Sequence, residues 1–346
     1  MRKLFFVVAM FVVCSMVLSA VPALAQEGAE PTPVWFSRMP RPEPPAVKFK
    51  IGFIVKTMDN PYYTRMRDGA VLAAEEYAAY LELEWNSAAR QGDVEGQIRL
   101  MEDMIRKDKD LIILNPMGGV ELISAIEQAN EAGVPVIIND TRSEGGEFLT
   151  FVGFENRPAA AQMAEFLVDY YGGPGQAQAK IAILEGFRGH STAEDRLVGY
   201  HDVLDGEPGM EVVTSMTGDW ERSKGMALAE DFITSNPDLD LIIGSNDEMA
   251  LGAVEAIVAA GKQDQIKTVG FDAICGALTE MLERDVMIAT VDNHPDLQGY
   301  ESVVAAYRYL VLNDTLPENI FVPGEIIRGD DPGLADLVEQ RCAAKE

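Results

Sequence analysis

The chain has 346 residues, of which 47% are hydrophobic and 24% charged, and its net charge is −28. At roughly 150 residues per domain this length predicts two domains, and the composition is that of a globular protein. Such strong acidity excludes a nucleic-acid partner, because binding to nucleic acid depends on the neutralisation of phosphates by basic side chains.

Residues 1–25 have the three regions of a secretory signal peptide. The basic pair Arg2-Lys3 precedes an apolar run over residues 4–18, and a small-residue cleavage site ends at Ala25. The run is shorter than the roughly 20 residues of a membrane-spanning helix. We therefore expect cleavage after Ala25 and a periplasmic or other extracytoplasmic location. The mature chain then has 26 basic and 56 acidic residues and a net charge of −30.

Residues 26–47 contain six prolines and no hydrophobic periodicity, which predicts an extended, proline-rich tether. Export would leave two cysteines, Cys275 and Cys342, in an oxidising compartment that allows a disulfide between them. Spacing alone leaves free thiols equally open, because it does not show whether the two side chains come within bonding distance.

From residue 48 onward, short apolar runs alternate with amphipathic stretches, which predicts parallel sheets covered by helices. The expected strands of the first half are Ile51–Val55, Leu81–Trp85, Leu111–Leu114, Val134–Ile138 and Phe148–Phe154, and the helices between them are Tyr62–Ala79, Asp93–Lys107 and Val120–Ala132. The pattern repeats with strands Ile181–Leu184, Glu211–Met216, Leu241–Ile243, Thr268–Phe271 and Met287–Val291 and with helices such as Gly225–Thr234 and Glu248–Ala260. Two doubly wound α/β lobes result.

Amides, carboxylates and aromatic side chains follow most of these strands. In parallel sheets ligands bind beyond the carboxyl ends of the strands. Aromatic faces pack on C–H groups, and Asn and Asp bind hydroxyls, so the combination suits a neutral polyhydroxylated small molecule. Asn and Asp also cap helices, and we expect this role for Asp219 and Asp247.

Several of these segments resemble, in order and over nearly all of residues 48–328, the type I periplasmic sugar-binding proteins, and the ribose-binding branch is the nearest. The segments are VKTMDNPYYTRMRDGA, LIILNP, GVPVIINDT, GDWERSKGMALAEDFITSNPDLDLIIGSNDEMALGAVEAIVAAGK, VGFDA and IATVDNHPDLQG. LacI-type repressors share this architecture, but their DNA-reading helical domain has no counterpart before residue 48.

The resemblance implies an α/β fold of two doubly wound parallel-sheet lobes joined by a three-strand hinge. It places the N-terminal lobe at 48–153 plus 294–319 and the C-terminal lobe at 154–293 plus 320–346, with crossings near 153–155, 293–294 and 319–321. It also implies a sugar site. In that site Tyr62 and Tyr63 form one aromatic wall and Trp220 the other, and the hydrogen-bonding residues are Asn60, Asp140, Asn246, Asp272 and Asn293.

Two positions depart from the family pattern. Glu194 stands where sugar binders commonly place an arginine toward the ligand, and Arg196 matches a second, more structural arginine. Thr141 intervenes between Asp140 and Arg142, which leaves open whether Arg142 reaches the site or lies on the surface. Because an unpaired buried charge costs several kcal/mol, the acids Asp140, Glu194 and Asp272 would disfavour an anionic ligand. We expect a neutral pentose, hexose or polyol, with a cationic amino sugar as the alternative.

The sequence offers no set of residues for catalysis. Its three histidines, His190, His201 and His294, lack the spacing of a catalytic triad or a metal site, and no phosphate-binding loop is present. We expect no enzymatic activity, no cofactor and no metal. The predicted function is that of a monomeric solute-binding protein that delivers its ligand to an ABC permease. Docking on a chemoreceptor or a sensor kinase remains the alternative.

Overall fold

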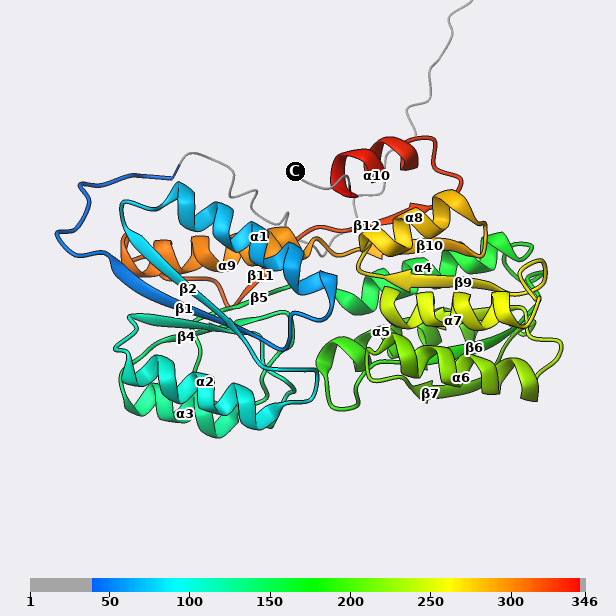
Figure 1. Cartoon of the computed structure of the whole chain (residues 1–346), viewed down its shortest axis with the longest axis horizontal. Coiled ribbons are helices and arrows are strands. Elements are labelled where there is room, and N and C mark those ends of the chain that lie inside the picture. The colour runs from blue at the N-terminus through cyan, green and yellow to red at the C-terminus, as the bar shows by residue number, and fades with distance from the viewer. Residues whose placement is uncertain (1–38, 343–346) are drawn as a thin grey trace, which may run out of the picture. The chain divides into compact units, whose positions relative to one another are not determined.

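The computed structural model describes residues 39–342, and these residues form two sheets, each covered by helices on both faces (Figure 1). The predicted signal peptide and residues 26–38 of the predicted tether lie outside the described residues. The end of the tether lies against the first lobe, because the Tyr80 hydroxyl donates to the Pro42 carbonyl at 2.6 Å and the Tyr307 hydroxyl to the Pro40 carbonyl at 2.7 Å.

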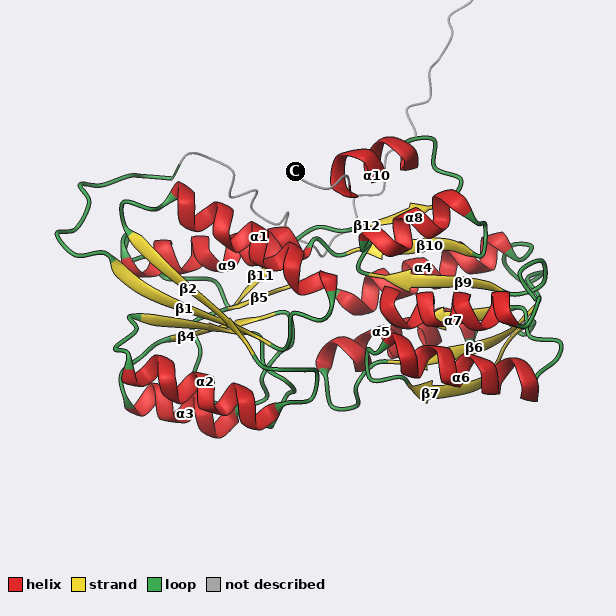
Figure 2. Ribbon diagram, viewed as in Figure 1, coloured by secondary structure: helices red, strands yellow, loops and turns green. Residues whose placement is uncertain are grey.

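The first sheet has the strand order β11-β5-β4-β3-β1-β2, and all of its pairings are parallel. Its strands are β1 (Phe49–Val55), β2 (Leu81–Ser87), β3 (Leu111–Leu114), β4 (Val136–Asn139), β5 (Phe151–Gly153) and β11 (Asn319–Phe321). Helices α1 (Pro61–Glu76) and α9 (Pro295–Leu310) cover one face, and α2 (Val94–Arg106) and α3 (Ile123–Glu131) cover the other (Figure 2). This sheet and its helices are the N-terminal lobe.

The second sheet repeats this order as β12-β10-β9-β8-β6-β7 and is parallel except at β12, which runs antiparallel to β10. Its strands are β6 (Ala179–Glu185), β7 (Met210–Thr217), β8 (Leu241–Gly244), β9 (Lys267–Phe271), β10 (Met287–Asp292) and β12 (Glu325–Arg328). One face is covered by α4 (Asn156–Tyr170) and α5 (Ser191–Leu204), and the other by α6 (Arg222–Ser235), α7 (Asp247–Ala259) and α8 (Cys275–Glu283). With α10 (Leu334–Cys342), these elements are the C-terminal lobe.

The short apolar runs of the sequence form the buried strands at the centre of both lobes. Strands β3, β4 and β8 are buried along their whole length, as expected for parallel strands with helices on both faces. Each face of each sheet has its own cluster of buried apolar side chains. The predicted fold class, an α/β protein with two parallel-sheet lobes, is confirmed.

The chain passes from one sheet to the other after β5, after β10 and after β11. Asp292, at the second passage, has no exposed surface and lies between two arginines. Arg65 of α1 approaches one carboxylate oxygen to 3.2 Å, and Arg341 of α10 approaches the other to 2.7 Å. A disulfide joins Cys275 to Cys342 and ties α10 to α8. The end of the described chain is therefore fixed to α8 by a covalent bond and to the hinge by an ion pair.

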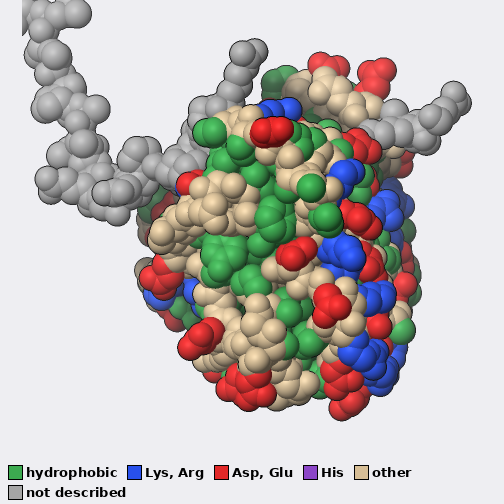
Figure 3. All heavy atoms as spheres, turned by 90° about the vertical axis from the view of Figure 1, so that its left-hand side faces the viewer, with side chains coloured by type: hydrophobic (Ala, Val, Ile, Leu, Met, Phe, Trp, Pro, Cys, Tyr) green, Lys and Arg blue, Asp and Glu red, His purple; other side chains and the backbone are tan. Residues whose placement is uncertain are grey.

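On the face drawn in Figure 3, Asp and Glu side chains are scattered between apolar and neutral groups, and Lys and Arg side chains gather along the right-hand edge. No helix within residues 39–342 combines the length and the apolar character needed to cross a membrane.

Candidate ligand-binding site

A cavity of about 660 Å³ lies between the two lobes, at the carboxyl ends of the central strands. It is lined by seven of the ten residues predicted for the site: Asn60, Tyr62, Tyr63, Asp140, Trp220, Asn246 and Asp272. It is also lined by residues that the sequence analysis did not assign to it, among them Lys56, Thr57, Arg90, Gln91, Thr192 and Arg196.

The two tyrosines enter the cavity because a helix begins directly before them. Asn60 caps α1, accepting a hydrogen bond from the Tyr62 backbone at 2.8 Å, and Pro61 has the fixed backbone angle that suits a first helical position. The rings of Tyr62 and Tyr63 meet edge to face, with centroids 5.2 Å apart. Both residues are at least nine-tenths buried. They form an apolar wall that carries two hydroxyl groups.

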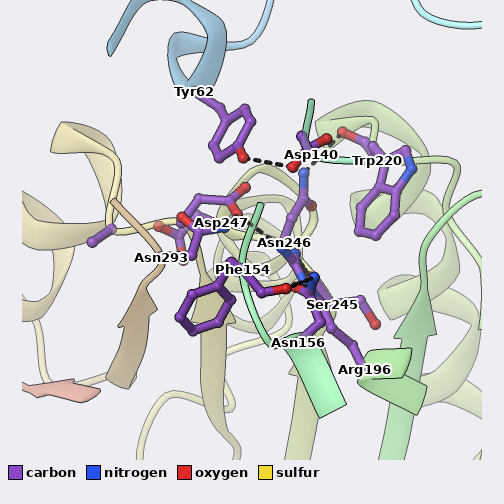
Figure 4. A network of polar contacts seen from close by, with 12 residues as sticks. Tyr62, Asp140, Phe154, Asn156, Arg196, Trp220, Ser245, Asn246, Asp247 and Asn293 are labelled. Atoms are coloured by element: carbon purple, nitrogen blue, oxygen red, sulfur yellow. Dashed lines mark hydrogen bonds and ion pairs between the residues drawn. The ribbon is translucent and has the colours of Figure 1, made fainter. Parts of the chain in front are cut away.

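Asp140 follows β4 and is the polar centre of the N-terminal side. Its carboxylate accepts a hydrogen bond from the Tyr62 hydroxyl at 2.6 Å (Figure 4). It also accepts from Asn115 Nδ2 at 3.2 Å and from Thr141 Oγ1 at 3.2 Å. Burial, followed by the charge of Asp140, raises the pKa of Tyr62 well above its usual range, so this phenol stays a donor. The backbone φ of Asp140 is +60°, a strained region that persists where the surroundings fix the residue.

Lys56 is a buried cation of this wall that the sequence analysis missed. It follows β1 and is 2% exposed, and its Nζ donates to Thr141 Oγ1 at 2.6 Å and lies 3.7 Å from Asp140 Oδ2. Burial lowers its pKa, and the carboxylate of Asp140 opposes that effect. A lysine directly after a strand was the available signal, since strand ends form the site in this fold.

Trp220 forms the opposite wall, and two neighbours fix its ring. Its indole Nε1 lies 3.2 Å from Nδ1 of His190, which stacks on Phe187 with centroids 5.0 Å apart. Gly186 lies under the ring, because a Cβ at this position would come within 2.1 Å of Trp220 carbons. Burial and then the charge of Lys56 lower the pKa of His190 to about 2, so this imidazole is neutral at physiological pH.

Arg196 and Asp272 supply the charges of the C-terminal side. Arg196 is 3% exposed, and its guanidinium donates to Asn156 Oδ1 at 2.9 Å, to the Ser245 carbonyl at 2.6 Å and to Asp272 Oδ1 at 3.4 Å. It also lies over the Phe271 ring, 3.6 Å from the centroid. Burial and then the charge of Asp140 raise the pKa of Asp272 to about 7, although Arg196 opposes the shift.

Asn246 lies at the cavity, but both ends of its amide have partners in the protein. Its Oδ1 caps α7 by accepting from the Met249 backbone at 3.0 Å, and its Nδ2 donates to the Trp220 carbonyl at 3.3 Å. The prediction that Asp247 caps α7 is therefore wrong, because Asp247 instead accepts hydrogen bonds from Thr290 Oγ1 and from the Ile274 backbone. Asp219 does not cap α6 either. It bonds Thr217 and Lys224.

Three predicted residues lie outside the cavity lining, and Glu194 differs most from its expected position. Glu194 is exposed in the first turn of α5, where it accepts from the Gly189 backbone at 3.3 Å. Residues two apart on a helix face different sides, so Arg196 points inward where Glu194 points to solvent. The assignment of these two positions is corrected: the arginine is at the cavity and the glutamate is not.

Arg142 lies on the hinge side, where its guanidinium donates to Asn319 Oδ1 and lies 4.3 Å from the Phe151 ring centroid. Thr141 takes the place next to Asp140, which turns Arg142 away from the cavity. Asn293 is 1% exposed and lies behind Asp272, to which its Nδ2 donates at 3.2 Å. It acts on the site through Asp272.

These placements change the charges that were counted for the alternative of a cationic ligand. That expectation counted three acids at the site and no basic residue beyond Arg142. The structure removes Glu194 from the cavity and adds Lys56 and Arg196, so Asp140 and Asp272 each have a cation beside them. The lining also includes acids that the sequence analysis did not assign to it, namely Asp59, Glu221, Glu248 and Glu255.

The fold and the site define a two-lobed binding protein with a ligand cavity between its lobes. Residues 51–314 match the periplasmic binding protein domain, and the chain belongs to this family. The resemblance to type I periplasmic sugar-binding proteins is thereby confirmed.

Curated relatives and solved structures support this membership. The chain is 33% identical over 259 residues to the ribose import binding protein RbsB of Bacillus subtilis, covering 75% of this chain and 81% of that protein. It is 32% identical over 269 residues to a D-ribose/D-allose-binding protein of Pseudomonas aeruginosa, covering 76% and 82%. A Bacillus halodurans solute-binding protein with bound myo-inositol superposes with a TM-score of 0.76 at 28% identity, covering 85% of this chain and 98% of that one.

Proposed function

We propose that this protein captures a small neutral sugar or sugar alcohol between its lobes and delivers it to the permease of an ABC importer. The observation that supports this most is the pairing of aromatic rings from the two lobes, Tyr62 and Tyr63 against Trp220, around buried polar groups. Sugars have C–H faces that pack on such rings and hydroxyls that need paired donors and acceptors.

Some polar groups of the site have no hydrogen-bond partner in the protein and could bind hydroxyl groups of a ligand. Within the described residues the Tyr63 hydroxyl has no hydrogen-bond partner, and one carboxylate oxygen of Asp272 has none either. A ligand hydroxyl can accept a hydrogen bond from the Tyr63 hydroxyl, and a ligand hydroxyl can donate one to this Asp272 oxygen. Its binding would satisfy groups that otherwise depend on water, and satisfied polar groups are what buried sites require.

The partners and the location follow from the same proposal. The relatives are named as import binding proteins, and we propose that this chain likewise acts outside the cytoplasm, as a monomer and without catalysing a reaction. We assign residues 48–153 plus 294–321 to the lobe that carries the tyrosines, because β11 ends at Phe321 in its sheet, and residues 154–293 plus 322–342 to the lobe that carries Trp220. Closure about the hinge would present both lobes to a permease.

A thermal-shift screen of the mature protein tests the proposal. The panel contains aldoses, ketoses and sugar alcohols, including D-ribose, D-allose and myo-inositol, with amino sugars and amino acids for comparison. A ligand at 100 times its Kd stabilises the folded state by about 2.7 kcal/mol, which raises the midpoint measurably. We expect a shift with one or a few neutral compounds. The proposal would be contradicted if only amino acids raised the midpoint, or if no compound of the panel raised it.

A further inference from the structure

Lys56 is a buried charge to which the proposed function gives no role. It is 2% exposed, follows β1 and lines the cavity beside Tyr62 and Asp140. Burial of an ammonium group is costly unless a charge partner is near, so lysines are seldom fully buried. Because Lys56 lines the ligand cavity, we expect its charge to influence which ligands bind.

The carboxylate of Asp140 does not depend on Lys56 for hydrogen bonds. Its two oxygens already accept from Tyr62, Asn115 and Thr141. Lys56 Nζ bonds Thr141 and stays 3.7 Å from the carboxylate, beyond hydrogen-bond length. Its contribution to Asp140 is therefore the neutralisation of charge.

The C-terminal lobe has a matching pair across the cavity. Arg196 Nη2 lies 3.4 Å from Asp272 Oδ1, and both side chains are at least 94% buried. Each lobe thus brings one cation and one carboxyl group to the lining of the cavity, and the four charges balance once Asp272 is ionised, above its pKa of about 7. The other charged groups at the cavity, Asp59, Arg90, Glu221, Arg222, Glu248 and Glu255, are exposed or half-buried, where water and salt screen them.

The balance depends on Lys56. Without its charge the two buried carboxylates would face one guanidinium, and a ligand ammonium could replace the missing cation. With it, a cationic ligand adds a positive charge that neither Asp140 nor Asp272 is left to match, and burial of an unmatched charge is unfavourable.

We propose that Lys56 is a specificity-determining residue, whose buried ammonium beside Asp140 makes the cavity accept uncharged ligands and reject amino sugars. This inference rests on the proposed function, since it concerns the selectivity of the same site.

The test compares Lys56→Met, which keeps the length of the side chain and removes its charge, with the wild type. Each protein is titrated calorimetrically with D-glucose and D-glucosamine, with D-galactose and D-galactosamine, and with the strongest neutral hit of the screen and its 2-amino-2-deoxy counterpart. The wild type should prefer the neutral member of the best-bound pair by at least about 100-fold, and Lys56→Met should reduce that preference by at least about tenfold.

Two further variants separate charge selection from structural damage. Lys50→Met removes an exposed lysine from the same strand and should leave the preference unchanged. Lys56→Met combined with Asp140→Asn removes one charge of each sign, and the preference for the neutral sugar should return although both affinities fall. If Lys56→Met alone does not fold, Lys56→Gln serves in its place, because its amide is neutral but can still donate to Thr141, and it should reduce the preference in the same way.

The outcomes distinguish the two proposals. If the wild type binds no neutral sugar, the proposed function fails and the role of Lys56 fails with it. If the wild type binds a neutral sugar but Lys56→Met weakens both members of the pair equally, Lys56 has a structural role only, and the proposed function still holds.

Discussion

Both walls of the cavity combine a cation, a carboxyl group and aromatic side chains, but the hydrogen bonds of these groups differ between the walls. The N-terminal wall is Lys56, Tyr62, Tyr63 and Asp140, and its carboxylate accepts from three uncharged donors. The C-terminal wall is Arg196, Trp220 and Asp272, and its carboxyl accepts from a guanidinium and from Asn293. Lys56 has one hydrogen-bond partner in the described structure, whereas Arg196 has three.

This difference indicates which charges each lobe can lose. Arg196 keeps Asn156, the Ser245 carbonyl and the Phe271 ring if Asp272 is removed. Lys56 keeps only Thr141 if Asp140 is removed. Lys56 and Asp140 therefore depend more on each other's charge than Arg196 and Asp272 do. Equivalent substitutions in the two pairs should change the stability by different amounts.

The largest expected effect is that of Asp140→Ala on stability. It leaves Lys56 buried without a counter-charge, and the loss of one member of a buried pair costs about 3–5 kcal/mol. Asp272→Ala should cost less, because Arg196 retains its other partners. Urea unfolding of both variants at neutral pH measures the difference. Equal losses, or a greater loss for Asp272→Ala, would contradict the comparison.

Removal of the disulfide should affect the C-terminal lobe. Replacing both Cys275 and Cys342 by Ser should lower the free energy of unfolding by about 2–4 kcal/mol, because the unfolded chain regains freedom in the segment between them, whose ends are 67 positions apart in the sequence. Hydrogen exchange should rise first in α8 and α10 and leave α1 to α3 unchanged. A uniform rise in both lobes would show that α10 does not stabilise its own lobe selectively.

Trp220→Ala should weaken binding of the neutral ligand by about 1–3 kcal/mol, the range of a well-buried aromatic contact. Gly186→Ala should weaken it as well, since the added methyl group would clash with the indole. Calorimetric titration measures the ligand affinity of both variants. Tyr170, which is 46% exposed on α4, provides a matched aromatic control as Tyr170→Ala. Unchanged affinity in Trp220→Ala would place the ligand elsewhere.

Asp272 should contribute the smallest effect, through pH. Its pKa is about 7 in the folded protein against 3.8 normally, so between these values the folded state holds a proton that the unfolded state has lost. The contribution of this group to the free energy of unfolding therefore falls as pH rises from about 4 to about 7 and is constant above. Asp272→Asn should remove this fall, a difference on the order of 1 kcal/mol or more between pH 5 and pH 8.

Glu301 provides the control for the pH experiment. Burial raises its pKa to about 7 as well, and it lies on α9, outside the cavity lining. Glu301→Gln should flatten the same part of the stability profile without changing ligand affinity, whereas Asp272→Asn should change both. A profile unaffected by Asp272→Asn would mean that this carboxyl is ionised in the folded state at pH 5.

Much of the architecture could be predicted from the sequence, because buried parallel strands such as β3, β4 and β8 are uninterrupted apolar runs. The site residues at strand ends, including Tyr63, Asp140 and Trp220, were predictable for the same reason: the topology brings those ends to one place. The cap at Asn246 was missed, because adjacent Asn and Asp side chains offer the same chemistry to a helix start.

Side-chain direction was the part that the sequence could not supply. Glu194 and Arg196 are two residues apart, and which of them faces the cavity depends on the rotation of α5 against the sheet. Arg142 depends in the same way on the backbone at Asp140, whose positive φ is not encoded by a residue type that requires it. Lys56 was missed because a lysine after a strand is usually an exposed residue.

A crystal structure of the mature protein with the best neutral ligand of the screen tests the central claim most directly. The account predicts one ligand between the Tyr63 and Trp220 rings, with a hydroxyl at Asp272 and another within hydrogen-bond reach of Lys56. A ligand bound outside the interlobe cavity, or one that contacts the residues of a single lobe only, would contradict it.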